Sequence, residues 1–224
     1  RHKNKTTSRE FIQLIFKNFQ ECHGDRLGYD DPAVIGGIGF LDKLPVTVIG
    51  IEKGHDLASN MQVNFGQAYP EGYRKALRLM KQGEKFNRPI VTFINTPGAF
   101  CGVDAESRGQ GIAIADNLLF LADVKVPVVA IIIGEGGSGG ALALALGDKV
   151  WVLEFSFYAI LSPEGFAAIL YKDATKAQEA AKLMQLSPEE LLQGQVVDKI
   201  IPETSGKRNL TSAEVAEMHD FEDE

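Results

Sequence analysis

The part of this chain best suited to chemistry is the backbone of a glycine-rich segment. Six of the nine residues from Ile133 to Ala141 (IGEGGSGGA) are Gly or Ser, and they directly follow an apolar, β-rich run. Glycines let the backbone approach a ligand closely, and the start of a following helix adds a partial positive charge. The segment therefore predicts a site for an anion or for an oxygen that gains negative charge.

A second segment of this kind, Asn95 to Gly102 (NTPGAFCG), follows the preceding predicted strand. Amide-rich loops at the ends of successive strands could converge on one oxygen. Preorganised N–H donors can each contribute about 3 to 4 kcal/mol to the stabilisation of a transition state. Such a site needs no acid or base from the side chains of the loops.

The same glycines also fit a dinucleotide-binding motif. Gly134, Gly136 and Gly139 match GxGxxG after a strand, and Glu154 lies 20 residues beyond the first of them. Against this alternative, the helix expected from Gly139 runs only to about Gly147, which is short for that unit.

A serine hydrolase is another alternative, because Gly136, Ser138 and Gly140 match GxSxG. The histidine of its triad would have to be His219, the only one downstream, and it lies among acidic residues. A third alternative is purely structural, since glycines also allow a helix to pack tightly on a sheet.

The elements that must position these segments alternate between strand and helix. In the first part of the chain, the apolar periodicity and the capping residues predict an amphipathic docking helix at about 8–21, a hairpin at 34–41 and 46–52, and a surface helix with a basic coat at 71–86. The middle part is predicted to form a strand at 90–94, a helix at about 106–121, a strand at 128–133 and a short helix after Gly139. The last part is predicted to form strands at 150–154 and 158–161, helices from Ser162, at 176–184 and near 188–192, and a strand at 196–201. Alternation of this kind indicates an α/β fold.

Composition narrows the class of protein. The formal charge of −7, from 23 basic and 30 acidic residues, argues against a nucleic-acid or membrane surface. Cys22 and Cys101 form no zinc motif and no disulfide framework. The longest apolar stretch, 126–133, is far shorter than the roughly 20 residues of a membrane helix, and the basic start is no secretory signal. We expect a cytosolic protein with one domain at 1–203 and an acidic tail at 204–224.

Four long segments carry a family resemblance. They read NFGQAYPEGYRKALRLMKQGEKF (64–86), FINTPGAFCGVDAESRGQG (93–111), IIGEGGSGGALALALGDKVW (132–151) and ILSPEGFAAILYKD (160–173). In this order they resemble the α subunits of bacterial acetyl-CoA carboxylase carboxyltransferase. The likeness runs from about residue 8 to about residue 203, nearly the whole chain.

The resemblance implies a crotonase-like (ClpP/crotonase) fold of repeated ββα units. It also implies a β subunit of the same fold that carries zinc, an α2β2 assembly, and association with biotin carboxylase and the biotin carboxyl carrier protein. In the family, carboxybiotin on the carrier supplies the carboxyl group, and the enolate of acetyl-CoA takes it up to give malonyl-CoA for fatty acid synthesis.

Site residues follow from the same resemblance. Gly139 and Gly140 are expected to offer backbone N–H groups to the ureido oxygen of biotin, with Gly136 and Gly137 shaping the loop. The candidates for substrate contacts are Gly98, Ala99, Phe100, Ala141, Arg74 and Lys75. A solvated helix face on which Glu71 pairs with Lys75 fits most of the basic side chains of this helix better than a ligand contact does.

The chain departs from the usual family wording at two places. The first loop has Phe100, Cys101, Asp104 and Ser107 where many members have Tyr, Pro, Gly and Glu. The segment 55–63, commonly rich in Lys and Arg, contains neither residue here. A catalytically weakened paralogue that acts as a binding module of the same complex is the alternative that these departures leave open.

Overall fold

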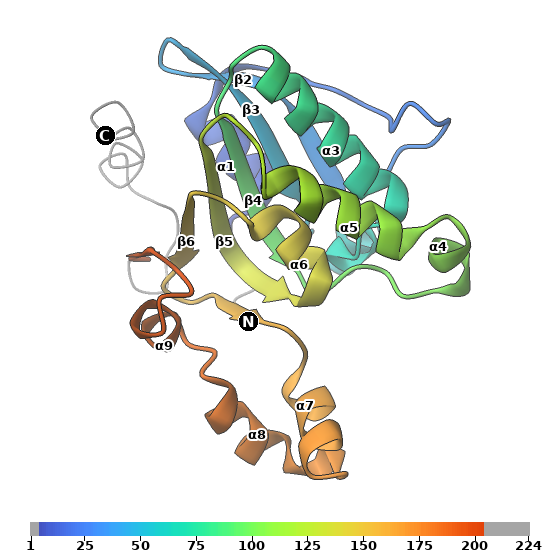
Figure 1. Cartoon of the computed structure of the whole chain (residues 1–224), viewed down its shortest axis with the longest axis vertical. Helices are drawn as coiled ribbons and strands as arrows, with labels where there is room; N and C mark the ends of the chain where they lie inside the picture. The colour runs from blue at the N-terminus through green and yellow to red at the C-terminus, as the bar shows by residue number, and fades with distance from the viewer. Residues whose placement is uncertain (1–4, 204–224) are drawn as a thin grey trace.

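A mixed eight-stranded β-sheet forms the centre of the part of the chain that the computed structural model describes, residues 5–203 (Figure 1). Its strands are β1 (Lys17–Glu21), β2 (Val34–Leu41), β3 (Leu44–Ile51), β4 (Ile90–Thr96), β5 (Val128–Gly137), β6 (Lys149–Leu153), β7 (Phe157–Ala159) and β8 (Lys199–Ile201). They lie in the order β1-β2-β3-β4-β5-β6-β8, and β7 pairs with β5. From β3 onward all neighbours are parallel, so the carboxyl ends of β3, β4 and β5 meet at one edge.

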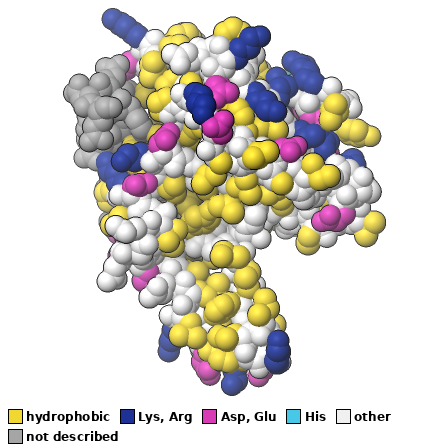
Figure 2. Space-filling model, in the orientation of Figure 1, with side chains coloured by type: hydrophobic (Ala, Val, Ile, Leu, Met, Phe, Trp, Pro, Cys, Tyr) yellow, Lys and Arg dark blue, Asp and Glu magenta, His cyan; other side chains and the backbone are white. Residues whose placement is uncertain are grey.

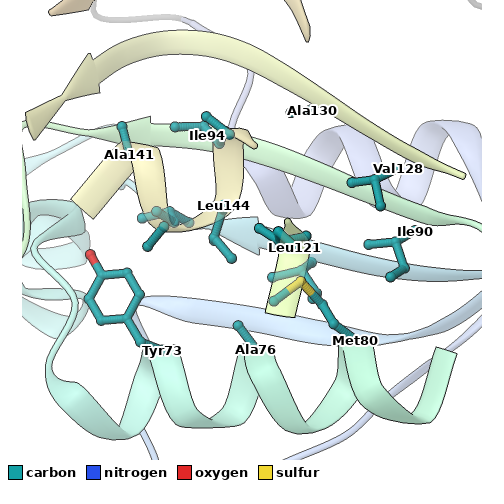
Figure 3. Packing of buried hydrophobic residues seen from close by; sticks show 14 of the residues in the cluster. Tyr73, Ala76, Met80, Ile90, Ile94, Leu121, Val128, Ala130, Ala141 and Leu144 are labelled. Atoms are coloured by element: carbon teal, nitrogen blue, oxygen red, sulfur yellow. The ribbon is translucent and has the colours of Figure 1, made fainter. Parts of the chain in front are cut away.

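Three helices cover one face of this sheet: α3 (Pro70–Lys85), α5 (Gln110–Leu121) and α6 (Ser138–Ala145) (Figure 1). Figure 3 shows the core between them and the strands, where Tyr73, Met80, Leu121, Leu144 and Ile94 belong to one cluster of buried side chains. Burial of one large apolar side chain contributes about 1.5 to 3 kcal/mol. This apolar layer fixes α6, and with it the start of the glycine-rich helix, against the sheet.

The opposite face carries α1 (Ser8–Ile15), which begins with a capping box between Thr7 and Glu10. Its residues Phe11, Ile12 and Ile15 are buried in a second apolar cluster, and the rings of Phe11 and Phe93 stack at 5.6 Å. The prediction that the first helix docks on the body of the protein is confirmed.

The predicted length of that helix is wrong, because residues 17–21 form an edge strand that pairs with β2. The approach of the two strands depends on glycine. A Cβ at Gly37 would lie 2.1 Å from the Gln20 carbonyl oxygen, and one at Gly39 would lie 2.8 Å from Phe16 Cβ. The helical spacing of the first 15 residues holds, but pairing with a glycine-rich strand determines the residues that follow.

Two other boundaries also differ from the prediction. The helix expected at about 106–121 is divided into α4 (Val103–Ser107) and α5, because Gly109 adopts φ +82° between them. The strand expected at 128–133 continues to Gly137, so Gly134, Gly136 and Gly137 lie in β5 and only Ser138 begins the helix. The predicted hairpin is confirmed as β2 and β3.

The remaining elements lie outside the layers. Short α2 (Leu57–Gln62) and η1 (Asn64–Gly66) precede α3, and α7 (Pro163–Leu170), η2 (Ala174–Lys176) and α8 (Ala177–Met184) form an arm that projects below the sheet in Figure 1, before α9 (Pro188–Gln193). Apolar side chains gather on the arm in Figure 2, and Ile169, Leu170 and Leu183 are exposed there. Among residues 5–203, no helix combines the length and the apolar character that crossing a membrane requires. The predicted acidic tail lies outside the described residues, and the single domain at 1–203 stays a prediction.

Candidate functional site

The two predicted loops meet at the carboxyl edge of the sheet, where β4 and β5 end. Thr96 pairs with Gly136 across these strands. A Cβ at Gly137 would lie 2.2 Å from the Pro97 carbonyl oxygen, and one at Gly140 would lie 2.3 Å from the Ala99 nitrogen. Only glycine allows backbone to approach backbone this closely, so the contact between the loops is built into the sequence.

The first loop is held by hydrogen bonds to its own backbone. Gly98 adopts φ +144°, and the Thr96 hydroxyl accepts from the Gly98 N–H at 3.0 Å while donating to the Gly98 carbonyl at 2.9 Å. The Phe100 N–H donates to the Ala68 carbonyl at 3.1 Å. Gly98 and Phe100 therefore use their N–H groups inside the protein, and a Cβ at Gly98 would lie 3.6 Å from Ser138 Cβ in the second loop.

The second loop offers open backbone at the start of α6. Gly137 is the N-cap residue and provides no side-chain cap, and Ser138 is exposed. A Cβ at Gly139 would find its nearest atom, Ile114 Cγ2, at 3.9 Å, whereas Gly140 is buried against the first loop. The first N–H groups of a helix lack partners within the helix and carry its positive dipole end, so this turn can bind an oxyanion.

Ser138 stands in the left-handed region at φ +57°, where a Cβ is strained. We expect Ser138→Gly to raise the free energy of unfolding by about 1 kcal/mol, because glycine adopts this conformation without strain. Urea unfolding followed by circular dichroism measures the change. The matched control Ser107→Gly, at the exposed last residue of α4, should lower stability by about 0.5 kcal/mol. A loss of stability in Ser138→Gly would contradict the strain.

Tyr73 lies beneath the place where the loops meet. Its side chain is fully buried in the core (Figure 3). Its hydroxyl lies 2.7 Å from the position that a Cβ on Gly140 would take. Burial raises the pKa of the Tyr73 hydroxyl well above its ordinary value. The hydroxyl has no hydrogen-bond partner among the described residues. Ala141, another predicted contact residue, lies in the same core and faces away from solvent.

The predicted basic contacts, Arg74 and Lys75, are engaged inside the protein. Lys75 is buried, and its Nζ donates to Asp30 and to the Asp31 carbonyl. The Arg74 Nε donates to Asp25 Oδ2 at 3.0 Å, and its Nη1 donates to the Arg108 carbonyl at 2.9 Å. The prediction of a basic coat on α3 is wrong for Lys75, which is buried with nine other residues of the helix, whereas Lys81 and Lys85 are exposed. The part of Arg74 and Lys75 in substrate binding stays a prediction.

The unusual residues of the first loop have local partners. The Phe100 ring packs on Tyr69 with centroids 4.7 Å apart, and Cys101 is exposed. Asp104 accepts two hydrogen bonds from Arg108 at 2.8 Å, and the Ser107 hydroxyl donates to the Asp104 carbonyl. The contacts of Asp104 and Ser107 lie within α4 and its C-cap, and none of these contacts involves Gly136, Gly137, Gly139 or Gly140.

Sequence reasoning missed the polar residues that hold the loops. Asn95 Oδ1 accepts from the Glu135 N–H at 3.1 Å, and Lys53 pairs with Glu135. The buried Gln110 side chain donates to the carbonyls of Ala68 and Phe100. A polar residue at the end of an apolar strand, as at Asn95, was the one available signal.

The two enzyme alternatives find little support. A hydrolase would match the strand-to-helix turn at Ser138, but His23 bonds to Asp30 and His55 to Glu10, and His219 lies outside the described residues. For a dinucleotide fold, α6 has only eight residues, and Gly134 and Gly136 lie within the strand.

The fold matches solved carboxyltransferases. Transcarboxylase 12S superimposes with a TM-score of 0.74 at 20% identity, covering 87% of this chain and 38% of that chain. The β subunit of geranyl-CoA carboxylase from P. aeruginosa gives a TM-score of 0.70 at 16% identity, covering 86% of this chain and 38% of that chain. The chain thus spans about two fifths of these larger proteins, and the architecture is the crotonase-like fold that the resemblance implied.

Sequence comparison is more specific. The family model described as acetyl co-enzyme A carboxylase carboxyltransferase-like matches residues 1–220. The acetyl-coenzyme A carboxylase carboxyl transferase subunit alpha of Streptococcus sanguinis (strain SK36) is 64% identical over 203 residues, covering 91% of this chain and 79% of that protein. Its counterpart from Streptococcus equi subsp. equi (strain 4047) is 59% identical over 218 residues, covering 97% and 84%. The chain belongs to the acetyl-CoA carboxylase carboxyltransferase family. Within that family it belongs to the α subunits.

Proposed function

We propose that this chain, as an α subunit, holds the ureido oxygen of biotin while a carboxyl group passes from carboxybiotin on a carrier protein to acetyl-CoA, giving malonyl-CoA. The observation that carries the proposal is the open first turn of α6, where Gly139 and Gly140 follow an N-cap without a side chain. When bound, biotin delivers the carboxyl group. The residues of the chain supply the N–H groups that stabilise negative charge on its oxygen.

The geometry of the loops fits this role. Gly140 is fixed against Ala99, and Thr96 fixes Gly98, so the N–H groups at the helix start are preorganised before a ligand arrives. Gly98, Ala99 and Phe100 serve as the wall that directs the ligand toward Gly139. Preorganisation matters because donors that are already oriented need not reorganise during the reaction.

Partners are part of the proposal. A β subunit would supply the acyl-CoA half of the site and the zinc, in an α2β2 assembly that works with biotin carboxylase and the carrier protein. The exposed apolar side chains of the α7–α8 arm support a protein interface, because apolar patches on soluble proteins commonly mark such surfaces.

The test is the reverse half-reaction, malonyl-CoA-dependent carboxylation of biotin, by the chain mixed with its β subunit. We expect activity only in the mixed sample and a loss of about 100-fold or more in Gly139→Val, because the valine blocks access to the backbone. Since space is open at Gly139, the variant should fold and still form the complex, which size-exclusion chromatography checks. A well-formed wild-type complex without turnover would refute the proposal and favour the binding module.

A further inference from the structure

A buried ion pair joins the end of β3 to the second loop. Lys53 lies two residues beyond β3, and its side chain is only 5% exposed. The Lys53 ammonium donates to Glu135 Oε2, although the two residues are 82 positions apart in the sequence. Glu135 stands directly before Gly136 and Gly137, so Lys53 contacts the strand that leads into the open turn of α6.

Asn95 completes the packing of the three strand ends. Its Oδ1 accepts from the Glu135 N–H, and a Cβ at Gly134 would lie 2.5 Å from the same oxygen. A Cβ at Gly66 would lie 2.8 Å from the Asn95 carbonyl oxygen and 3.7 Å from Lys53 Cδ. The Lys53 side chain therefore runs through a closely packed region to Glu135, with little freedom to move.

The charge of Glu135 matters at this place. A carboxylate a few residues from N–H groups that stabilise negative charge would oppose that charge, since like charges repel strongly where water is scarce. Lys5 also interacts electrostatically with Glu135, but its own Nζ bonds to the Phe155 carbonyl and Ser156. Lys53 is a buried cation in direct contact with the carboxylate.

We propose that Lys53 is a positioning residue for carboxyl transfer: by pairing with Glu135 it cancels the carboxylate charge and fixes the backbone that enters the Gly139–Gly140 turn. The inference rests on the function proposed above. Lys53 acts through Glu135 and takes no part in bond making or breaking.

The test compares Lys53→Met, Glu135→Gln and the double variant in the complex with the β subunit, using the malonyl-CoA-dependent carboxylation of biotin. We expect Lys53→Met to lower kcat about tenfold, because it leaves the Glu135 charge less compensated. The KM for malonyl-CoA should stay within about twofold, because the pair does not touch that substrate. The double variant should recover to within about threefold of wild type, because the uncompensated charge is gone, and the loss that remains reflects the missing contact between residues 53 and 135. A double variant no better than Lys53→Met, or a wild-type kcat in Lys53→Met, would overturn the inference.

Two further measurements keep the result readable. If Lys53→Met does not fold, Lys53→Arg takes its place. This variant should retain kcat to within about threefold, because it preserves the charge. A larger loss of kcat in Lys53→Arg, together with a double variant that recovers, counts against the inference. Hydrogen exchange on the chain alone needs no turnover, so it separates this inference from the proposed function. Lys53→Met should speed exchange of the amides at 133–141 by about tenfold or more, and unchanged exchange refutes the positioning role.

Discussion

Replacing Gly140 with alanine should lower the free energy of unfolding by about 3 kcal/mol and abolish carboxyl transfer, because the added methyl group overpacks the contact between the two loops. The new Cβ would lie 2.3 Å from the Ala99 nitrogen, 2.7 Å from the Gly98 carbonyl carbon and 2.7 Å from the Tyr73 hydroxyl. Two of these atoms are backbone, so relief requires the first loop to move. Urea unfolding and the biotin half-reaction measure the two effects.

Gly139→Ala is the matched control, one residue away in the same turn. Its Cβ would meet nothing closer than 3.9 Å, and alanine favours a helix over glycine by about 0.8 to 1 kcal/mol. We therefore expect the control to be as stable as wild type or slightly more so. Equal stability of the two alanine variants would show that the loops are not in the close contact described above.

The contrast between these neighbouring glycines marks what the sequence could not reveal. The composition of 133–141 identified the segment and its relation to a strand and a helix. It could not distinguish Gly139, where an added Cβ would have space, from Gly140, where it would clash with Ala99, because that difference depends on a loop about 40 residues earlier. Convergence of the loops is a property of the parallel pairing of β4 and β5.

Local patterns predicted most elements correctly because the apolar periodicity and the caps are local signals. The failures occur where a distant contact determines the backbone. Residues 17–21 continue an apolar helical pattern, but they pair with β2 because Gly37 and Gly39 leave room for them. Likewise, Lys75 lies on a helix rich in basic residues and is buried, because Asp30 and the Asp31 carbonyl accept from its ammonium.

The same reasoning explains why charged residues were the hardest part of the site to assign. A basic residue on an amphipathic helix suggests a ligand contact or a solvated face. Here Arg74, Lys75 and Lys53 instead satisfy carboxylates and carbonyls of the chain itself. The internal charges therefore shape the backbone, and the open backbone at the start of α6 remains for the ligand.

Asp31→Ala should lower the free energy of unfolding by about 2 to 4 kcal/mol at pH 7, the second large effect, because it leaves two buried N–H groups without a hydrogen-bond acceptor. Asp31 Oδ1 accepts from the Ala33 N–H at 2.9 Å, and Oδ2 accepts from the Tyr69 N–H at 2.7 Å. The carboxylate thereby ties the entry of β2 to the start of α3. The exposed Asp116→Ala on α5 is the control and should change stability by less than about 0.5 kcal/mol.

The effect of Asp31 should depend on pH in a defined direction. The pKa of the Asp31 carboxyl is raised from 3.8 to about 6. Burial is the largest cause, and the charge of Glu71 adds to it, whereas the N–H bonds from Ala33 and Tyr69 and the charge of Lys75 lower the pKa. The folded protein thus binds this proton more tightly than the unfolded chain does. The tighter binding of this proton adds about 3 kcal/mol to the free energy of unfolding. This contribution is fully present below about pH 4 and is lost as pH rises through about 6.

The destabilisation caused by Asp31→Ala should therefore be largest near pH 4 and should shrink by about 3 kcal/mol on the way to pH 7. Asp25 and Asp30, whose pKa values are lowered, act in the opposite direction in both proteins, so the difference between wild type and variant removes the part of their effect that does not depend on Asp31. Urea unfolding of both proteins across this range measures it. A difference that grows with pH would mean that the N–H bonds to the ionised carboxylate outweigh the cost of its burial.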